Sequence, residues 1–179
     1  MNIAPTFVRS VDALTSAVGK FASWLVLAAS LISAGNAAVR YAVNYSSNGL
    51  LEIQWYLFGA MVLLGASHTL RMNEHVRVDL FYSSRSERTQ TWIDLVGFAL
   101  FFLPVIGYLF WLSMPFFLQS WRNQEVSSSA GGLILWPAKL LLPLGFGLLW
   151  LQGLSELIKR VLVLQGAMSL ETKYEKPLQ

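Results

Sequence analysis

The sequence predicts an all-α integral membrane protein with four transmembrane helices and both termini in the cytoplasm. Composition, four long apolar runs and the distribution of cations predict this fold class. Of the 179 residues, 55% are hydrophobic and only 13% are charged, which is about half of the ~25% charged residues in soluble domains. Because a soluble domain of this size cannot bury so much apolar surface, we expect the chain to lie in a membrane.

Four runs are long and apolar enough to cross a bilayer, which requires roughly 20 residues. The runs are residues 21–39, 53–70, 95–118 and 139–157. We expect them to form a single four-helix domain, kinked at the internal prolines Pro104, Pro115 and Pro143 where neighbouring helices accommodate the kinks. The first run is longer than a signal-peptide core and starts late, so we do not expect cleavage.

The cations predict the orientation. Ten lie on the side of the two termini: Arg9, Lys20, Arg71, Arg77, Arg85, Arg88, Lys159, Arg160, Lys173 and Lys176. Three lie on the other side: Arg40, Arg122 and Lys139. The positive-inside rule therefore predicts a cytoplasmic loop at 71–90 and a cytoplasmic tail at 158–179. The spread of these cations over separate segments excludes a nucleic-acid-binding face.

The tryptophans are distributed as expected for a membrane protein. Trp24 and Trp92 lie near the predicted inner ends, and Trp55, Trp121 and Trp136 lie near the predicted outer ends. Indole rings favour both interfaces. Trp111 and Trp150 lie away from these levels, and we expect them to pack between helices.

Catalytic and metal-binding motifs are missing from the sequence. There is no cysteine, and His68 and His75 are seven residues apart without a second ligand pattern, so we expect interfacial polar roles, no metal and no cofactor. No nucleophile motif or phosphate-binding loop occurs. The serines at 127–129 are expected to form a flexible outer connector. We therefore expect that the protein is not an enzyme.

Few ionisable residues lie within the runs, although such residues usually mark ion or substrate pathways. Asn36, Gln152 and hydroxyl groups are the candidate polar groups at depth. The charged residues Glu52, Asp94, Lys139 and Glu156 stand at run ends, where each can reach an interface. We therefore expect no transport pathway through this chain alone.

Two features of the first hairpin are candidates for a binding role. Arg40 ends the first run and Glu52 begins the second at the same predicted surface, so they either pair or face headgroups and water separately. Ser30, Ala34 and Ala38 recur every four residues, and small residues allow close helix packing in lipid. This packing involves the chain's own helices, an external partner, or both.

Residues 36–82 resemble the small membrane subunit of tripartite ATP-independent periplasmic (TRAP) transporters. The matching elements, in order, are Arg40-Tyr41, Glu52, Leu64-Gly65-Ala66, His75 and Val78-Asp79. Their order and spacing carry the resemblance, since each element alone is unspecific. The four-span plan extends it to nearly the whole chain.

The resemblance implies a non-catalytic scaffold subunit in the inner membrane of a bacterium. Its partners would be a large TRAP membrane subunit, a periplasmic substrate-binding protein and membrane lipids, without nucleic acid. The large subunit would carry the sodium and substrate sites of a sodium-gradient-driven importer of an organic acid. Spans one and two are the expected contact with that subunit.

The polar segment after the second run is interpreted as an inner-surface elbow. It contains Arg71, Glu74, His75, Arg77 and Asp79. The two arginines are expected to bind anionic headgroups. His75 and Asp79 are four residues apart and could touch on a helical turn, which would shape the elbow.

Three other functions remain open from the residues. The main alternative is a stand-alone four-helix membrane scaffold or assembly factor. An intramembrane enzyme or haem-binding electron carrier lacks ligands and nucleophiles in the sequence. A homo-oligomeric channel lacks a polar stripe on any span.

Overall fold

The computed structural model describes residues 3–45, 47–73 and 85–167. Its helices are α1 (Ile3–Val43), α2 (Asn48–Met72), α3 (Glu87–Gly97), the π-helical turn η1 (Phe98–Phe102), α4 (Leu103–Asn123) and α5 (Trp136–Leu164). Within these described segments, β-structure is limited to one isolated bridge between Val126 and Ile134. Because α3, η1 and α4 run on without interruption, four helices are long and apolar enough to cross a membrane. The predicted fold class is confirmed; its orientation remains a prediction.

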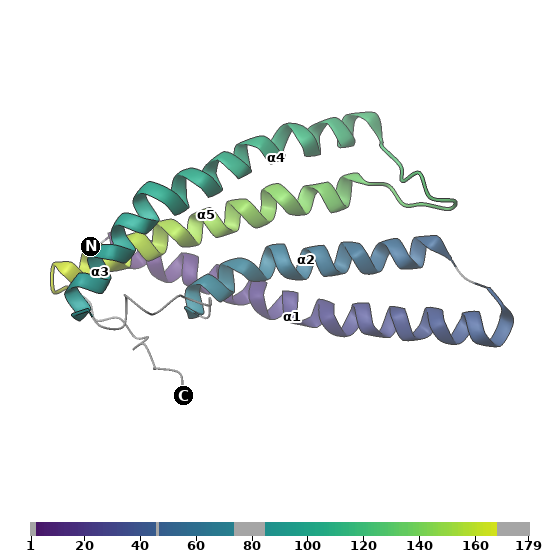
Figure 1. Ribbon diagram of the computed structural model, residues 1–179, viewed down its shortest axis with the longest axis horizontal. Helices are drawn as coiled ribbons and strands as arrows, with labels where there is room; N and C mark the ends of the chain where they lie inside the picture. Colours follow the sequence, from purple (N-terminus) through teal and green to yellow (C-terminus); the bar gives the residue numbers. More distant parts are fainter. Residues whose placement is uncertain (1–2, 46, 74–84, 168–179) are drawn as a thin grey trace.

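The helices form a flat array rather than a square bundle (Figure 1). Their order across the array is α1, α2, α5, α4, and α1 also crosses α5 near the N-terminus. The start of α1, the end of α2, the start of α3 and the end of α5 lie together, and we call this the terminal end. The opposite end, with residues 44–45, 47 and 124–135, is the hairpin end.

Each helix runs beyond its predicted span, and α1 does so most. It has 41 residues, about 60 Å in length and twice the ~30 Å hydrocarbon core. The added first half has an amphipathic stripe of Val8, Val11, Thr15 and Ala22, all buried, at the three-, four- and seven-residue spacings of one helix face. The hydropathy criterion missed this half because Arg9, Asp12 and Lys20 interrupt it.

The third span contains a π-helical turn directly before Pro104. The backbone N–H of Leu103 donates to the carbonyl of Phe98, five residues earlier. A proline lacks the N–H that its helix needs, and its ring clashes with the carbonyl four residues before it. The wider turn accommodates both effects, and the helix continues past Pro104 without interruption.

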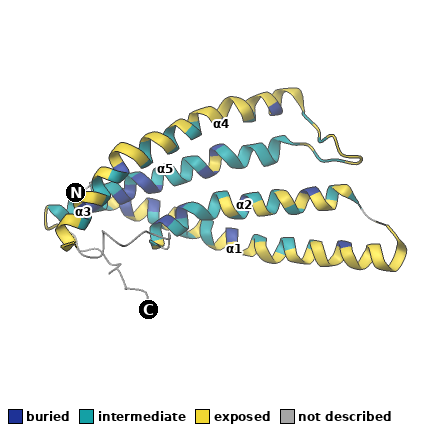
Figure 2. Ribbon diagram, viewed as in Figure 1, coloured by how far each residue is buried: buried dark blue, intermediate teal, exposed yellow. Residues whose placement is uncertain are grey.

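Close helix contacts in the array depend on glycine. A side chain at Gly145 of α5 would meet Leu63 of α2, including its backbone oxygen at 2.9 Å. At Gly19 of α1 it would meet the side chain of His68 on α2 at 2.4 Å. Buried residues concentrate at the terminal end, whereas the hairpin-end half of α1 is almost entirely exposed (Figure 2).

Candidate functional site

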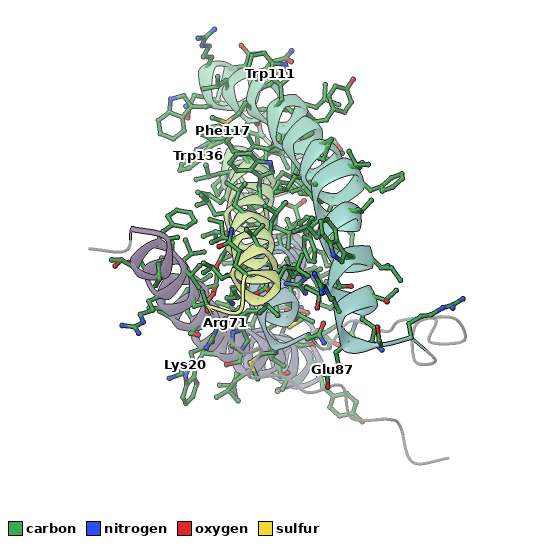
Figure 3. The ribbon with its side chains drawn as sticks, turned by 90° about the vertical axis from the view of Figure 1, so that its left-hand side faces the viewer. Lys20, Arg71, Glu87, Trp111, Phe117 and Trp136 are labelled. Carbon is green, nitrogen blue, oxygen red and sulfur yellow. The ribbon has the colours of Figure 1, made fainter. Side chains whose placement is uncertain are left out.

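A network of polar side chains, half of them buried and half partly exposed, joins four helices at the terminal end. Its members are Asp12 (α1), Arg71 (α2), Asp94 (α3) and Gln152, Ser155, Glu156, Lys159 and Arg160 (α5). We call this set the terminal cluster. Viewed from this end of the molecule, Arg71 lies among the helices while Lys20 and Glu87 lie at the periphery (Figure 3).

Asp12 is the contact of α1 with this cluster. Its Oδ1 accepts from Lys159 Nζ at 3.0 Å, Gln152 Nε2 at 3.1 Å and Ser155 Oγ at 3.3 Å. Its Oδ2 lies 2.8 Å from Lys159 Nζ and 3.8 Å from Arg71 Nε. The Asp12 carboxylate thus links α1 both to α5 and to the end of α2.

Glu156 and Arg160 form the half of the cluster that faces α3. Glu156 accepts from Lys159 at 2.7 Å and from Gln152 at 3.0 Å, and its other oxygen accepts from Arg160. Arg160 Nε donates to Asp94 Oδ2 at 3.3 Å. The guanidinium also lies over the Phe98 ring, 4.5 Å from its centroid, and therefore contacts the π-helical turn.

Gln152 completes the network from the middle of α5. Its side chain is 0% exposed; the amide donates to both carboxylates, and Thr15 Oγ lies 3.0 Å from its carbonyl oxygen. A buried amide left unsatisfied would cost roughly 1–3 kcal/mol. Both the amide nitrogen and the carbonyl oxygen of Gln152 therefore have partners, and the bonds to Asp12 and Thr15 join α1 to α5.

The charges of the terminal cluster balance. Asp12, Asp94 and Glu156 face Arg71, Lys159 and Arg160, so three negative charges meet three positive ones. Buried pairs add little net stability, but they fix geometry and are costly to break. With every member paired, the cluster is suited to locking helices in position rather than to binding an ion.

Three members of the terminal cluster, Arg71, Asp94 and Glu156, were noted from the sequence, but their contacts were not predicted. Asp94 and Glu156 were expected to reach an interface separately, but the structure connects them through Arg160. Arg71 was expected to bind headgroups; it pairs with Asp12 and donates to Ser16. Asp12 was missed, although its place beside the buried Val8, Val11 and Thr15 was the available signal.

A second polar cluster, the hairpin latch, ties α2 to the segment between α4 and α5. Asn48, Glu52 and Tyr56 recur every four residues and so share one face of α2. Asn48 donates to the carbonyl of Ala130 at 3.1 Å, and Tyr56 donates to that of Ile134 at 3.2 Å. The Glu52 carboxylate accepts from the Leu133 N–H at 2.7 Å and from the Ser127 hydroxyl.

The latch bears on two predictions about this end of the molecule: the possible Arg40–Glu52 pair and the serine segment at 127–129. Glu52 is buried and bonded to the α4–α5 segment, while Arg40 is exposed and forms no ion pair with a described residue. The possible Arg40–Glu52 pair is therefore not formed. The serine segment, which the sequence predicts to be a flexible connector, is bonded at Ser127 to the Glu52 carboxylate and to the Leu133 carbonyl.

A salt bridge closes the same end on the side of α4. Lys139 Nζ contacts Glu125 and lies 4.2 Å from the Phe116 ring centroid. The hydrogen bond from Lys139 holds the pKa of Glu125 below its ordinary value of 4.5. Lys139, which begins the fourth predicted span, thus has a partner within the chain.

The small residues of α1 lie on an unpartnered edge of the array. Ser30, Ala34 and Ala38 are exposed, and Tyr41 is 95% exposed. Gly35 has no atom of another residue within 4 Å of the position where a side chain would begin. The chain's own packing therefore does not explain the small residues of this edge.

The opposite edge, formed by α4, carries large side chains. Trp111 is 74% exposed, and Phe101 and Tyr108 are also exposed. The prediction that Trp111 packs between helices is wrong within this chain; Trp150 does pack there, since its Nε1 donates to the Leu103 carbonyl at 3.1 Å. The α1 edge also exposes large side chains such as Trp24 and Leu31, so it differs from the α4 edge in the small residues that lie between its large ones.

The remaining predicted residues lie outside the described part. His75, Arg77 and Asp79 of the elbow fall in residues 74–84. In the rest of the chain, His68 packs on Gly19, and the described residues hold no group of three or more potential metal ligands.

The comparisons with known proteins gave one match. The family model described as "Tripartite ATP-independent periplasmic transporters, DctQ component" matches residues 29–163, which is most of the chain. No curated protein and no solved structure matches significantly. The matched range includes the hairpin latch and the α1 edge, but begins after Asp12.

Proposed function

Because the chain belongs to the DctQ family of tripartite ATP-independent periplasmic transporters, we propose that it braces the large membrane subunit of such a transporter. The family makes it a small transporter component of the bacterial inner membrane and not an enzyme. The proposed transporter is driven by a sodium gradient and imports an organic acid delivered by a periplasmic binding protein. The substrate and sodium sites lie in the large subunit.

The exposed small-residue edge of α1 supports this proposal most directly. In lipid, helices associate by close van der Waals packing, and small residues allow their backbones to approach. Ser30, Ala34, Gly35 and Ala38 offer such a surface, while the large side chains of α4 suit lipid. We therefore place the large subunit against α1, with Arg40 and Tyr41 at its hairpin end.

The two polar clusters support a bracing role. The hairpin latch holds one end of the array, and the terminal cluster holds the other. Since their groups are engaged within the chain, they keep the α1–α2 and α4–α5 hairpins in fixed positions. A rigid array is what a moving large subunit would need as a support.

The orientation in this proposal follows the cations. In this proposal the terminal end faces the cytoplasm, because ten of the thirteen Lys and Arg residues are assigned to that side from the sequence. The hairpin end, with the latch and Tyr41, then faces the periplasm and the binding protein. The elbow residues His75, Arg77 and Asp79 belong to the cytoplasmic surface in this proposal.

Substitutions on the two edges test the proposed contact. The tagged chain would be purified in mild detergent from its native membrane. The proteins that co-purify with it would then be identified and quantified by mass spectrometry. Ala34→Trp is expected to reduce recovery of a large polytopic protein at least tenfold, whereas Leu112→Trp on α4 should leave it unchanged. Equal recovery with both variants would contradict the α1 contact, and a wild-type chain recovered alone would favour the stand-alone scaffold.

A further inference from the structure

The two helical hairpins of the array end at different levels at the hairpin end. Tyr56 of α2 donates to the carbonyl of Ile134, two residues before α5 begins at Trp136. The α2 helix begins eight residues before Tyr56, at Asn48, and eight residues of helix rise about 12 Å. The α1–α2 hairpin therefore extends farther than the helices α4 and α5 (Figure 1), and the segment 124–135 lies beside this extension.

The extension lies outside the hydrocarbon core of the membrane. Its neighbour, the segment 124–135, is irregular and largely exposed, and irregular backbone does not face lipid within the hydrocarbon region. The indole rings agree with this level, since Trp121 and Trp136 are in contact, with ring centroids 4.4 Å apart, and the exposed Trp55 adjoins Tyr56. Because indole rings favour the membrane interface, the first two turns of α2 lie beyond it.

The last part of α1 shares this level. Gly19 of α1 packs against His68 of α2, which is twelve residues from Tyr56. The two helices run antiparallel and side by side, so the residue of α1 that is level with Tyr56 lies twelve residues after Gly19, at Leu31. Residues 32–43, which we call the α1 tip, therefore lie outside the hydrocarbon core together with the start of α2.

The surface of the α1 tip is unsuited to water. Its sequence, ISAGNAAVRYAV, contains one charged side chain, Arg40. Val39, Tyr41 and Val43 are exposed between its small residues. A helix face in water normally carries charged and polar residues, and a continuous exposed apolar surface marks a contact with another molecule. Because the α1 tip lies beyond the lipid tails, the molecule that covers it is a protein.

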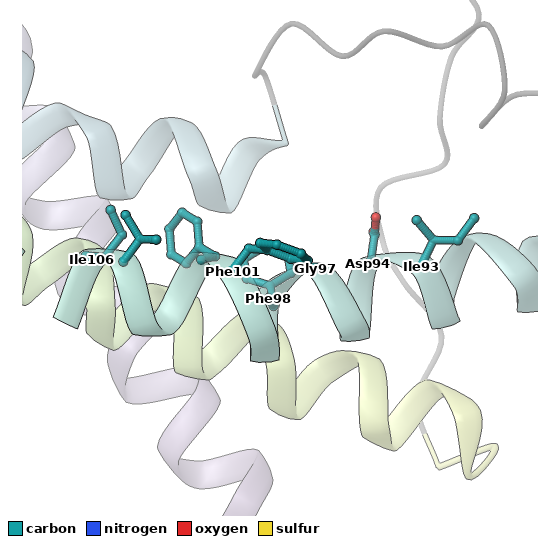
Figure 4. Close-up of a pocket in the computed structure, with 8 residues that line it drawn as sticks. Ile93, Asp94, Gly97, Phe98, Phe101 and Ile106 are labelled. Atoms are coloured by element: carbon teal, nitrogen blue, oxygen red, sulfur yellow. The ribbon is translucent and has the colours of Figure 1, made fainter. Parts of the chain in front are cut away.

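The exposed apolar side of the third span has no such requirement. Phe101 and Ile106 lie along this side (Figure 4), and both precede Trp121 in the same continuous helix. They therefore lie on the hydrocarbon side of the indole level. Lipid tails are as apolar as these side chains, so lipid alone covers this surface.

Arg40 lies too far out to be explained by lipid headgroups. It follows Leu31 by nine residues, which is about 13 Å along the helix, whereas the headgroup layer adds only ~5–8 Å to each side of the hydrocarbon core. Arg122 is different, because it adjoins Trp121 at the indole level, where phosphate groups are within reach. The two exposed arginines of the hairpin end therefore have different surroundings.

The chain itself offers Arg40 no acid. Glu52 and Glu125 are the acids that the sequence places at the hairpin end. Glu52 is bonded to the Leu133 N–H in the latch, and Glu125 is paired with Lys139. Arg40 forms no ion pair with a described residue, so its complement is a carboxylate on the protein that covers the α1 tip.

We propose that the α1 tip binds a segment of the large subunit that also extends beyond the hydrocarbon core, and that Arg40 pairs there with a carboxylate of that subunit. The partner is a permanent one, because a binding protein that leaves after each delivery would return the apolar surface to water. Tyr41, which is 95% exposed, belongs with arginine to the residue types enriched at protein interfaces. The inference rests on the proposed function and adds the level and the chemistry of the contact.

Maleimide labelling tests the level of the contact, since the reagent modifies only thiols that water reaches. A membrane-impermeant maleimide would be applied to open membrane fragments, so that it reaches both faces. The full chain carrying Ala38→Cys would be compared in its native membrane and in membranes of a host without the large subunit. We expect labelling in the host and at least tenfold less in the native membrane. Leu112→Cys, at hydrocarbon depth, is the control and should react only after detergent is added.

Charge reversal tests the ion pair. Arg40→Glu should lower co-purification of the large subunit about tenfold, because like charges then face each other. Arg40→Lys keeps the charge, and Arg122→Glu makes the same change at the indole level of α4, so both should leave co-purification unchanged.

Three results would overturn the inference. They are no labelling of Ala38→Cys in the host, which would place this residue in lipid, equal labelling in both membranes, and undiminished co-purification with Arg40→Glu. Each of them is compatible with a large subunit that still co-purifies with the wild type. A wild-type chain that recovers no large membrane protein would instead contradict the proposed function, and this inference with it.

Discussion

Single residues in this protein act mainly by joining helices. Glu52 is the clearest case, since its two carboxylate oxygens bind the Leu133 N–H and the Ser127 hydroxyl across the hairpin end. Gln152 has the same role at the terminal end, where it bonds to Asp12 and Glu156. Both side chains therefore have structural partners within the chain.

Replacing Glu52 tests the latch. Glu52→Leu removes both acceptors, so the backbone between α4 and α5 loses its anchor on α2. We expect faster amide hydrogen exchange at Leu133 and easier proteolysis within residues 124–135, with little change at the terminal end. Unchanged exchange at Leu133 would show that the latch does not hold this segment; Gln54→Leu, a neighbouring substitution outside the latch, is the control.

The Glu125–Lys139 pair predicts a pH dependence. Because the folded-state pKa of Glu125 lies below its ordinary value of 4.5, the unfolded state binds the proton more readily. The pair's stabilisation is therefore fully present above that value and is lost as the pH falls through the folded-state pKa. Melting curves between neutral and acidic pH should show this loss in the wild type and less of it in Glu125→Gln; parallel curves would contradict the prediction.

At the scale of elements, close helix contacts fix the array. α2 and α5 approach so closely at Gly145 that an added methyl group would meet Leu63 at 2.7 Å. Pro104 and the π-helical turn shape the third span, and Arg160 holds that turn against α5. At Gly19, Gly145 and Gly153 a neighbouring helix leaves no room for a side chain.

Gly145→Ala is expected to separate α2 from α5. Overpacking of this kind costs roughly 1–3 kcal/mol, and we expect a loss of that size in the unfolding free energy measured in mixed micelles. Gly59→Ala, whose added methyl group meets nothing within 4 Å, is the control and should be neutral or slightly stabilising. A neutral Gly145→Ala would mean that the helices move apart without cost.

Sequence reasoning found the elements more easily than their contacts. Hydropathy located all four spans, since each contains a long apolar run. It missed the first half of α1, because an amphipathic helix with Asp12 on its packed side does not resemble a span. It also missed Asn48 and Tyr56, whose partners are backbone carbonyls some 80 residues away in the sequence and therefore leave no local pattern.

At the scale of the whole molecule, two clusters hold a flat array whose edges differ. The terminal cluster links α1, α2, α3 and α5, and the latch links the two hairpins at the other end. Both edges expose large apolar side chains, but only the α1 edge also carries the exposed small residues Ser30, Ala34 and Ala38, which would let another helix approach closely.

Breaking the terminal cluster should destabilise the array as a whole. Arg160→Met leaves the buried Glu156 and Asp94 without their shared partner, and removing one member of a buried pair costs about 3–5 kcal/mol. We expect a loss of that order in the unfolding free energy. Combining Arg160→Met with Glu156→Gln and Asp94→Asn should recover part of it, because neither acid is then left facing a methionine in place of the guanidinium, while Lys159 keeps its bond to Asp12; a triple variant worse than the single one would contradict this prediction.

Cysteine cross-linking in the native membrane would show whether α1 contacts a large transporter subunit. The chain contains no cysteine, so single cysteines at Ala38 and Leu112 report on the α1 and α4 edges without background. We predict that Ala38→Cys cross-links to one large polytopic membrane protein and that Leu112→Cys does not. Cross-linking of Ala38→Cys only to a second copy of this chain, or equally from both edges, would contradict the account.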